Sequence, residues 1–390
     1  MFHAIARHRP PFVLLIGFCL VFVIYEVQWF GERGEKESRS TPVAGAKDML
    51  NHTKGILAQE NGGANHDHNH PPLKRLYICG YSLEQLSKEI FPDYSFQGRL
   101  TVKAKDQQQP TSNDILVYGT FGPCANYKVK KFPGATIFLN GESWRDDIRH
   151  RKNLHQYRLG PARDDGVYSI RLYYVAAVLI NEHSPWEWAK ITDPNQRPQS
   201  TMEYRAVIYA NSHCVRFRQR AARDIAKIIP VVFGGKCKVR SALNSKNPNR
   251  DNHDSWIDWD LVGQRRYQNA QIFTKFQFCL VMENTNHEGY ITEKILNAYL
   301  GGCLPIYYGT KEVFELFHPE SFVYYDIRNP EPALQLLKYL YYNETAFHER
   351  MRHPILRHGN ETIIKYFSIT DKLGGGVLKN RIRTMIGLKD

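Results

Sequence analysis

The chain is poor in cysteine and in acidic residues, and both shortages limit the sites that it can hold. Its 390 residues include only seven cysteines, and no two have C-x-x-C spacing, which argues against a zinc site. Aspartate and glutamate number 39 against 52 lysines and arginines, so the formal net charge is +13. An excess of this size favours anionic partners, namely nucleic acid, an anionic membrane or phosphorylated ligands. The sequence also has no internal repeat.

Long apolar runs are scarce, and the one that approaches the length of a membrane span lies at the N-terminus. It is apolar from Phe12 to Tyr25, and three further apolar residues bring it to roughly the 17–20 residues that a span needs. Two arginines precede it and place the N-terminus in the cytoplasm. Because no small-x-small cleavage site follows Tyr25, we expect an uncleaved anchor rather than a signal peptide. The expected segments are a cytoplasmic tail at 1–10 and a transmembrane signal anchor at 11–30.

An anchor in this orientation places the rest of the chain in the lumen of the secretory pathway and argues against nucleic acid as a partner. A short span with aromatic ends suits the thinner early secretory membranes, so we expect a Golgi membrane, with the endoplasmic reticulum as the alternative. N-glycosylation sequons agree with a luminal location and begin at Asn51, Asn343 and Asn360.

An oxidising compartment permits disulfides among the cysteines outside the span. Cys214 and Cys237 flank one helix–strand segment and are expected to pair. Cys279 and Cys303 lie in apolar strands and are predicted to remain buried thiols.

The composition divides the luminal part into a stem and two α/β domains. Residues 31–73 are polar, lack periodic apolar spacing and predict a flexible stem without coiled-coil heptads. Beyond it, strand-like runs alternate with helical stretches, which argues for parallel sheets. The expected parts are an acceptor-side domain at 74–190, a proline-containing hinge at 184–200, a donor-binding domain at 200–350 and a helical tail at 351–390. Apolar spacing in the tail predicts a helix that packs on the body, with a membrane-surface helix as the alternative.

The most informative segment is 276–309, FQFCLVMENTNHEGYITEKILNAYLGGCLPIYYG. An apolar run, a polar loop, an amphipathic stretch and a second apolar run predict strand, loop, helix and strand. Thr292 is expected to cap the helix, and Gly301 to end it. Such a unit presents a helix N-terminus at the carboxyl ends of its strands, where free N–H groups and Lys294 favour an anion. The segment therefore predicts a site for a phosphate-bearing ligand.

This segment resembles the donor-binding signature of the α1,3/4-fucosyltransferases, in the pattern E-N-T, G-Y-I-T-E-K, N-A-Y-L-G-G and L-P-I-Y-Y-G. The resemblance is densest over 276–309 and continues more weakly over about 204–345. It implies two Rossmann-like domains that face a cleft, the GT-B type. It also implies transfer of fucose from GDP-fucose to a glycan with inversion, expected at the 3-hydroxyl of GlcNAc, with no metal or other cofactor required. Contacts with the GDP-sugar are implied for Asn284, Tyr290, Glu293 and Lys294.

Departure of GDP requires positive charge beside the diphosphate. Lys294 is one candidate, and Arg220 is the other because its segment, NSHCVRFRQRAARD, is similar to an arginine-containing segment of the family. An arginine offers a planar fork matched to phosphate oxygens. The spacing is only loosely constrained, which leaves as alternatives Arg216, Arg218 and Arg223.

An inverting transfer also needs a base for the acceptor hydroxyl. Glu142 ends the strand-like run IFLNGES and resembles the E-S-P motif of the family, with Trp144 where the family has proline. We therefore expect Glu142 to be the base. The other candidates are Asp146, Asp147, Asp164 and Asp165.

Two patterns that suggest metal binding are weighed against this interpretation. Asp258 and Asp260 form a D-x-D motif, which binds a metal and a diphosphate in another glycosyltransferase architecture, but hard-cation sites need more ligands than it shows. The histidines of 66–70 belong to the low-complexity stem. Neither pattern predicts a metal site here. Other functions with the same fold are protein O-fucosylation and non-catalytic binding of glycans or nucleotides in the Golgi.

Overall fold

The computed structural model describes the chain from Lys74 to Leu388, with gaps. The described residues are 74–79, 84–100, 109–119, 129–142, 157–161, 163–211, 213–234, 237 and 268–388. The predicted anchor at 11–30, the stem at 31–73 and the sequon at Asn51 lie outside them. Of the helices that are described, none is both long enough and apolar enough to cross a membrane. All described residues belong to one compact unit, Asn69–Asp390.

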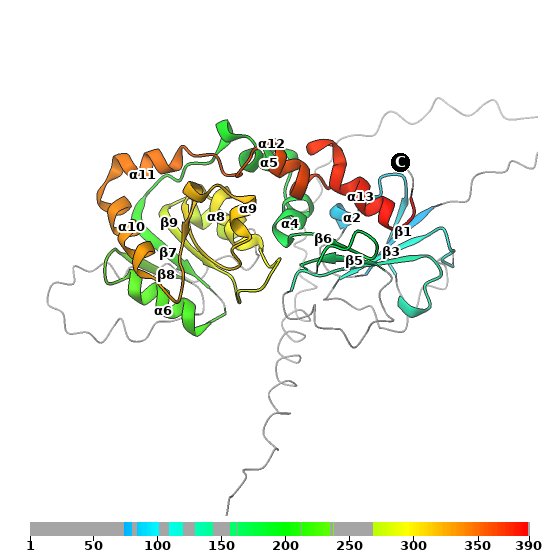
Figure 1. The fold of residues 1–390 in the computed structure, drawn as a ribbon, viewed down its shortest axis with the longest axis horizontal. Coiled ribbons are helices and arrows are strands. Elements are labelled where there is room, and N and C mark those ends of the chain that lie inside the picture. The colour runs from blue at the N-terminus through cyan, green and yellow to red at the C-terminus, as the bar shows by residue number, and fades with distance from the viewer. Residues whose placement is uncertain are drawn as a thin grey trace, which may run out of the picture. The chain divides into compact units, whose positions relative to one another are not determined.

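The N-terminal half of this unit is built on a six-stranded sheet of order β2-β1-β3-β4-β5-β6 (Figure 1). Every neighbouring pair of strands is parallel. Its strands are β1 (Arg75–Cys79), β2 (Ser95–Arg99), β3 (Ile115–Gly119), β4 (Ala135–Leu139), β5 (Tyr157–Gly160) and β6 (Ser169–Arg171). Its helices are α2 (Glu84–Ile90), α4 (Tyr174–Glu182) and α5 (Pro185–Thr192), followed by the short turn η3 (Pro194–Gln196). All five residues of β1 are buried, as expected for a parallel strand covered on both faces.

The C-terminal half is built on a five-stranded sheet of order β11-β10-β9-β7-β8, again with parallel pairs throughout. Its strands are β7 (Tyr204–Ala210), β8 (Val231–Gly234), β9 (Phe276–Met282), β10 (Leu304–Tyr308) and β11 (Val323–Tyr324). Its helices are α6 (Arg216–Ile225), α7 (Gln268–Phe273), α8 (Glu293–Leu300), α9 (Val313–Leu316), α10 (Glu331–Tyr342) and α11 (Glu344–Met351), with the turn η5 (Pro319–Ser321). The strand–loop–helix–strand order predicted over 276–309 is confirmed, and so are the parallel sheets.

Elements of the two halves meet around α4 and α8. The backbone N–H of Val175 in α4 donates to the carbonyl oxygen of Ile291, just before α8, at 2.9 Å. Buried side chains of both helices, among them Leu179 and Leu296, belong to one apolar cluster. The loop that leads into α8 is therefore anchored to the N-terminal half.

The C-terminal segment packs on the body, as the apolar spacing of the tail predicted, and it contacts the N-terminal half. It contains α12 (Asn360–Thr362), η6 (Ile363–Phe367), η7 (Gly374–Gly376) and α13 (Val377–Met385). Leu378 and Ile382 of α13 are buried. Arg383 donates to the carboxylate of Asp93, which follows α2, at 2.7 Å. The helix thus packs on the body.

Two disulfides decide the cysteine predictions. Cys214 and Cys237 are bonded, as expected. Cys279 and Cys303 are also bonded, so the prediction of buried thiols was wrong. Cys303 directly precedes β10, which runs beside β9, and the two Cα atoms lie 5.9 Å apart, within disulfide range. Only the pairing register of the two strands brings them together.

Candidate functional site

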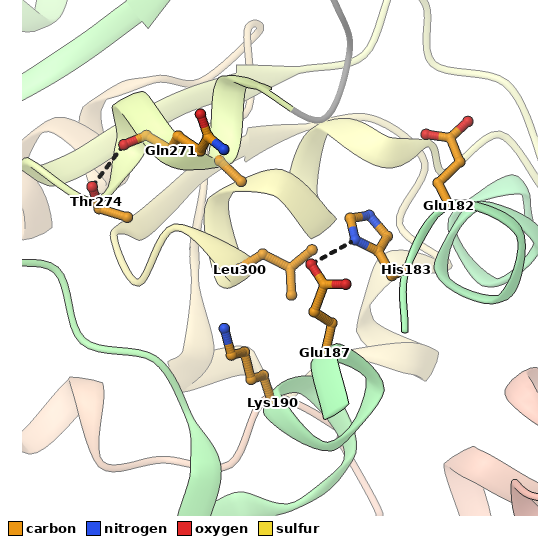
Figure 2. Close-up of a pocket in the computed structure, with 8 residues that line it drawn as sticks. Glu182, His183, Glu187, Lys190, Gln271, Thr274 and Leu300 are labelled. Atoms are coloured by element: carbon orange, nitrogen blue, oxygen red, sulfur yellow. Dashed lines mark hydrogen bonds and ion pairs between the residues drawn. The ribbon is translucent and has the colours of Figure 1, made fainter. Parts of the chain in front are cut away.

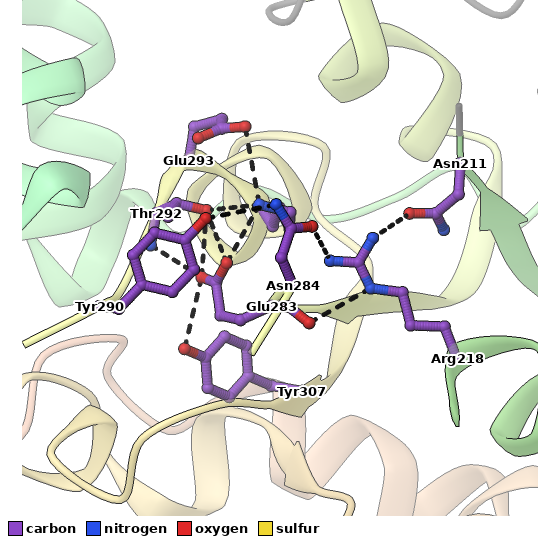
Figure 3. A network of polar contacts seen from close by, with 9 residues as sticks. Asn211, Arg218, Glu283, Asn284, Tyr290, Thr292, Glu293 and Tyr307 are labelled. Carbon is purple, nitrogen blue, oxygen red and sulfur yellow. Dashed lines mark hydrogen bonds and ion pairs between the residues drawn. The ribbon is translucent and has the colours of Figure 1, made fainter. Parts of the chain in front are cut away.

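A buried glutamate organises the loop between β9 and α8 (Figure 3). Glu283 follows β9 directly and is 0% exposed. Its carboxylate accepts hydrogen bonds from the N–H of Thr292 at 2.7 Å, from Lys294 Nζ at 3.0 Å and from the Tyr307 hydroxyl at 3.4 Å. A buried carboxylate needs such partners to remain charged. Glu283 therefore holds the loop in shape rather than presenting its charge to a ligand.

Thr292 stands at the N-cap position of α8, but its side chain makes no capping hydrogen bond. Its hydroxyl instead lies 2.9 Å from Glu283 Oε2 and 2.9 Å from Lys294 Nζ. The prediction was therefore right about where the helix begins and wrong about the cap. Because Thr292 does not cap them, the first N–H groups of α8 are suited to an anion.

Arg218 of α6 lies beside this loop and is 1% exposed. Its Nε donates to the carbonyl oxygen of Glu283 at 3.2 Å, and its two other nitrogens donate to the amide oxygens of Asn211 and Asn284. Burial lowers the pKa of Arg218, and the charge of Glu283 opposes that effect. Within the described residues, its hydrogen-bond partners are neutral oxygens. The guanidinium group of Arg218 is therefore positively charged without forming an ion pair with a carboxylate that it contacts.

Arg220, the arginine favoured from the sequence, is not part of this network. It is exposed on α6, as are Arg216 and Arg223, and its charge lowers the pKa of Tyr325 against the larger effect of burial. Because a helix turns about 100° per residue, two positions along the chain point to nearly opposite sides. The structure therefore brings Arg218, rather than Arg220, to the loop between β9 and α8.

A signal for Arg218 is present in the sequence. The buried residues of α6 are Arg218, Ala221, Ala222 and Ile225, which is the i, i+3, i+4, i+7 spacing of an inward-facing helix stripe. An arginine on such a stripe points toward the sheet instead of toward solvent.

The other predicted donor contacts lie close to Arg218 and Lys294. Asn284 Nδ2 donates to the hydroxyl of Tyr290 at 3.4 Å, and Glu293 Oε1 lies 4.0 Å from Lys294 Nζ. Tyr290 is 3% exposed. Its pKa is raised by burial and by the charges of Glu283, Glu142 and Glu293. The phenol therefore stays neutral and can donate or accept a hydrogen bond.

Glu142 lies close enough to Tyr290 for its charge to raise the pKa of the phenol. Glu142 comes two residues after Asn140, whose side chain accepts from the Glu142 N–H at 3.0 Å and donates to its carbonyl oxygen at 2.8 Å. A Cβ added at Gly141 would lie 2.6 Å from the Tyr174 ring, so this turn is closely packed. The expected base is thus brought near the residues expected to bind the donor, although the two are about 150 residues apart in the sequence.

The alternatives for the base have other surroundings. Asp164 pairs with Arg381 at 3.0 Å. Asp165 accepts hydrogen bonds from three N–H groups of its own loop, which is a structural role. The remaining candidates for the base, Asp146 and Asp147, lie outside the described residues. The sequence patterns considered for metals, Asp258, Asp260 and residues 66–70, also lie outside them. Among the described residues, no group of three or more His, Cys, Asp or Glu could hold a metal ion.

Ion pairs that the sequence did not predict connect the loop between β9 and α8 to the N-terminal half. Arg171, the last residue of β6, pairs with Glu288 at 2.5 Å and also with Glu312. Glu312 in turn accepts from the N–H of Gly289. Gly289 has φ +74°, and a Cβ there would lie 2.5 Å from the carbonyl oxygen of Pro161. No local pattern marks these residues, because Arg171 and Pro161 lie more than a hundred positions from the residues that they contact.

The two described sequons differ in their surroundings. Asn343 caps α11 by accepting from the N–H of Ala346 at 3.0 Å and donates to the Tyr339 hydroxyl at 3.2 Å. Asn360 is exposed at the start of α12.

Residues 201–353, which contain β7 to α11 and the network around Glu283, match the family model "Glycosyltransferase family 10 (fucosyltransferase) C-term". The chain carries a glycosyltransferase family 10 domain. The resemblance found in the sequence is thereby confirmed over this domain.

Curated relatives match about a third of this chain over part of their own length. The alpha-(1,3)-fucosyltransferase FucT of Helicobacter pylori is 32% identical over 121 residues, which are 31% of this chain and 21% of the relative. An alpha-(1,4)-fucosyltransferase of Arabidopsis thaliana is 29% identical over 123 residues, 30% of this chain and 29% of the relative. The chain therefore spans less than a third of the length of either.

Solved structures show a wider likeness in fold. A crystal structure of alpha1,3-fucosyltransferase has a TM-score of 0.52 and 20% identity, and the match covers 85% of this chain and 94% of that one. A second one, with GDP, has a TM-score of 0.50 and 20% identity, and covers 85% and 95%. The α/β fold with two parallel sheets is thus that of the GT-B fucosyltransferases.

Proposed function

We propose that the chain is a fucosyltransferase that moves L-fucose from GDP-β-L-fucose to a glycan with inversion. The observation on which this depends most is the buried guanidinium of Arg218, held by neutral oxygens beside the uncapped N-terminus of α8. Positive charge and N–H groups at one point suit a diphosphate. The match of residues 201–353 to the family 10 (fucosyltransferase) model supports GDP-fucose as the sugar nucleotide.

In this proposal Arg218, Lys294 and the first N–H groups of α8 bind the diphosphate of the donor. Lys294 also contacts Glu283, so its ammonium group is fixed in position before the donor arrives. Asn284 and Glu293 provide hydrogen-bonding groups for the ribose or the fucose.

The reaction itself needs one base and no covalent intermediate. Glu142 takes the proton of the acceptor hydroxyl while that oxygen attacks the anomeric carbon of fucose. The bond from this carbon to the diphosphate oxygen breaks with its electron pair, and GDP leaves with the additional negative charge that Arg218 and Lys294 stabilise. Attack opposite the leaving group converts the β-linked donor to an α-linked product. The expected acceptor atom is O3 of GlcNAc.

We also propose that residues 11–30 anchor the chain in the Golgi membrane with the family 10 domain in the lumen. The apolar run and its flanking arginines support this orientation. Two disulfides among the described residues fit an oxidising compartment. A glycosidase-sensitive mass shift that is lost in Asn360→Gln would test the luminal location.

The test is turnover of GDP-fucose by the full chain in EDTA, with oligosaccharide and peptide acceptors supplied separately. We expect GDP release only with oligosaccharides, and loss of it in Glu142→Gln but not in Glu84→Gln, a control at an exposed position of α2. Release with peptides alone would assign protein O-fucosylation instead. If GDP-fucose binds without transfer to any acceptor, the protein binds nucleotide sugars without catalysis, and the proposal fails.

A further inference from the structure

The turn that carries Glu142 is bound by the side chain of the residue two positions before it. Asn140 follows β4 directly and is 2% exposed. Its N–H donates to the carbonyl oxygen of Leu159 in β5 at 2.8 Å, which ties its main chain to the sheet. Its Oδ1 accepts from the Glu142 N–H at 3.0 Å, and its Nδ2 donates to the Glu142 carbonyl oxygen at 2.8 Å. One buried side chain therefore binds both main-chain polar groups of Glu142.

The amide group of Asn140 is suited to this double contact. Its oxygen accepts and its nitrogen donates, whereas an ionised aspartate would have no donor for the Glu142 carbonyl oxygen. Asparagine is also short enough to bond to the main chain two residues further on, which is why it is frequent in turns. The residue type at position 140 thus matches the shape of the turn.

Neighbouring residues enclose the same turn. A Cβ added at Gly141 would lie 2.6 Å from two ring carbons of Tyr174, the first residue of α4, so this ring packs directly against the main chain of the turn. A Cβ added at Gly160, at the end of β5, would lie 2.7 Å from the carbonyl oxygen of Asn140. The turn is therefore held by contacts with β5 and with the start of α4, in addition to its own hydrogen bonds.

The place of the Glu142 carboxylate depends on this turn. A general base must lie within hydrogen-bond reach of the proton that it removes, and a misplacement of about 1 Å can lower a rate about 100-fold. We propose that Asn140 is a positioning residue, which holds the Glu142 carboxylate at the acceptor hydroxyl. This inference rests on the proposed fucosyl transfer with Glu142 as its base.

Such a role predicts a change in kcat without a change in donor binding. Arg218 and Lys294, which are proposed to bind the diphosphate, belong to α6 and α8 in the C-terminal half. Asn140 and Glu142 follow β4 of the N-terminal sheet. Loss of the Asn140 side chain should therefore slow transfer and leave the Kd of GDP-fucose unchanged.

The experiment measures kcat for transfer to oligosaccharides and the Kd of GDP-fucose in the full chain. Asn140→Ala removes both hydrogen bonds to Glu142 and should lower kcat about 10- to 100-fold, with a Kd unchanged by titration calorimetry. Asn140→Ser keeps an oxygen that can accept from the Glu142 N–H, and it should recover part of the lost rate. Gly141→Ala displaces the turn by another route, through contact with the Tyr174 ring, and should also lower kcat alone.

A matched control lies at the other end of α4. Asn181 also accepts from a backbone N–H, that of Leu86 in α2, at 3.1 Å. Because a helix rises 1.5 Å per residue, it lies about 10 Å along the axis from Tyr174. It directly precedes Glu182, which lines the pocket shown in Figure 2. Asn181→Ala should lower the melting temperature and leave kcat unchanged.

The outcomes separate this inference from the proposed function. If the wild type transfers fucose and Glu142→Gln does not, full kcat in Asn140→Ala would overturn the positioning role alone. Equal losses of kcat in Asn140→Ala and Asn181→Ala would also overturn it, since they would reflect a general loss of stability. If melts show that Asn140→Ala is unfolded, Gly141→Ala decides by the same criterion. No transfer by the wild type would overturn both proposals together.

Discussion

Two buried charged residues near α8, Glu283 and Arg218, differ in whether their partners carry the opposite charge, and this difference indicates different roles. Glu283 is surrounded by donors, including an ammonium group, so its charge is balanced within the protein. Arg218 contacts neutral oxygens, so its charge remains available to a ligand. A buried cation without a balancing carboxylate is unfavourable on its own. A bound diphosphate would remove that unfavourable term.

The first prediction compares two arginines of α6. Arg218→Met should weaken GDP-fucose binding roughly 10- to 100-fold, since a hydrogen bond to a charged group contributes about 1.5–3 kcal/mol. Arg220→Met, on the exposed side of the same helix, should change it less than about twofold. Titration calorimetry measures both. Equal losses in the two variants would mean that α6 acts through its general charge.

The second prediction concerns the stability that Glu283 contributes. Glu283→Gln should lower the free energy of unfolding by about 3 kcal/mol, because Lys294 then faces a neutral amide in a largely buried site. Tyr307→Phe removes only the longest hydrogen bond of the network and should lower it by about 1 kcal/mol. Urea denaturation followed by circular dichroism gives both values. A similar loss in the two variants would show that packing, rather than charge, holds the loop.

At the scale of elements, the loop from β9 to α8 depends on contacts from both halves of the unit. Glu283 holds its β9 end, while Glu312 and the backbone of Pro161 enclose Gly289 in its middle. The local order of strand, loop and helix was predictable from apolar spacing. The support from Arg171 was not, because it depends on where β6 ends in space.

The third prediction tests this support through two glycines with positive φ. In Gly289→Ala the new Cβ would lie 2.5 Å from the Pro161 carbonyl oxygen, so the loop and Tyr290 must shift. Gly166 serves as the control: its φ is +67°, but no atom lies within 4 Å of the Cβ that Gly166→Ala would add. Both should lose about 1–2 kcal/mol of stability from the left-handed backbone. Only Gly289→Ala should also lose transfer activity; retained activity there would show that the loop tolerates displacement.

At the scale of the whole unit, the C-terminal segment ties the end of the chain to its first described helix. Thr370 and Lys372 donate to Glu89 of α2, and Arg383 donates to Asp93. Removal of the tail would therefore expose the apolar side of α2 as well as break these ion pairs. The family 10 domain alone, residues 201–353, lacks this closing segment.

The fourth prediction follows from the pKa of Asp93. Burial raises that pKa, but the hydrogen bond from Arg383, a backbone hydrogen bond and the charges of Arg383 and Lys74 together lower it more, so the folded-state pKa is below the ordinary value. The resulting stability is present above about pH 3.9, the unfolded-state pKa, and is lost as pH falls through the folded-state pKa. Asp93→Asn should therefore be less stable than the wild type at pH 7 and approach it at low pH. Thermal melts across this range measure the difference, and a gap of constant size would contradict the role of the charge.

Short-range patterns decided much of this protein. Apolar runs and helical spacing identified the strands and the helix over 276–309 and the α13 stripe, because these depend on neighbours within about two helical turns. The donor signature was recognised by its resemblance to a family. Contacts between distant segments decided the rest. They brought Arg218 rather than Arg220 to the loop before α8, joined Cys279 to Cys303 and placed Glu142 near Tyr290. Which side of a helix is buried, and which strand ends meet, are properties of packing that no local spacing contains.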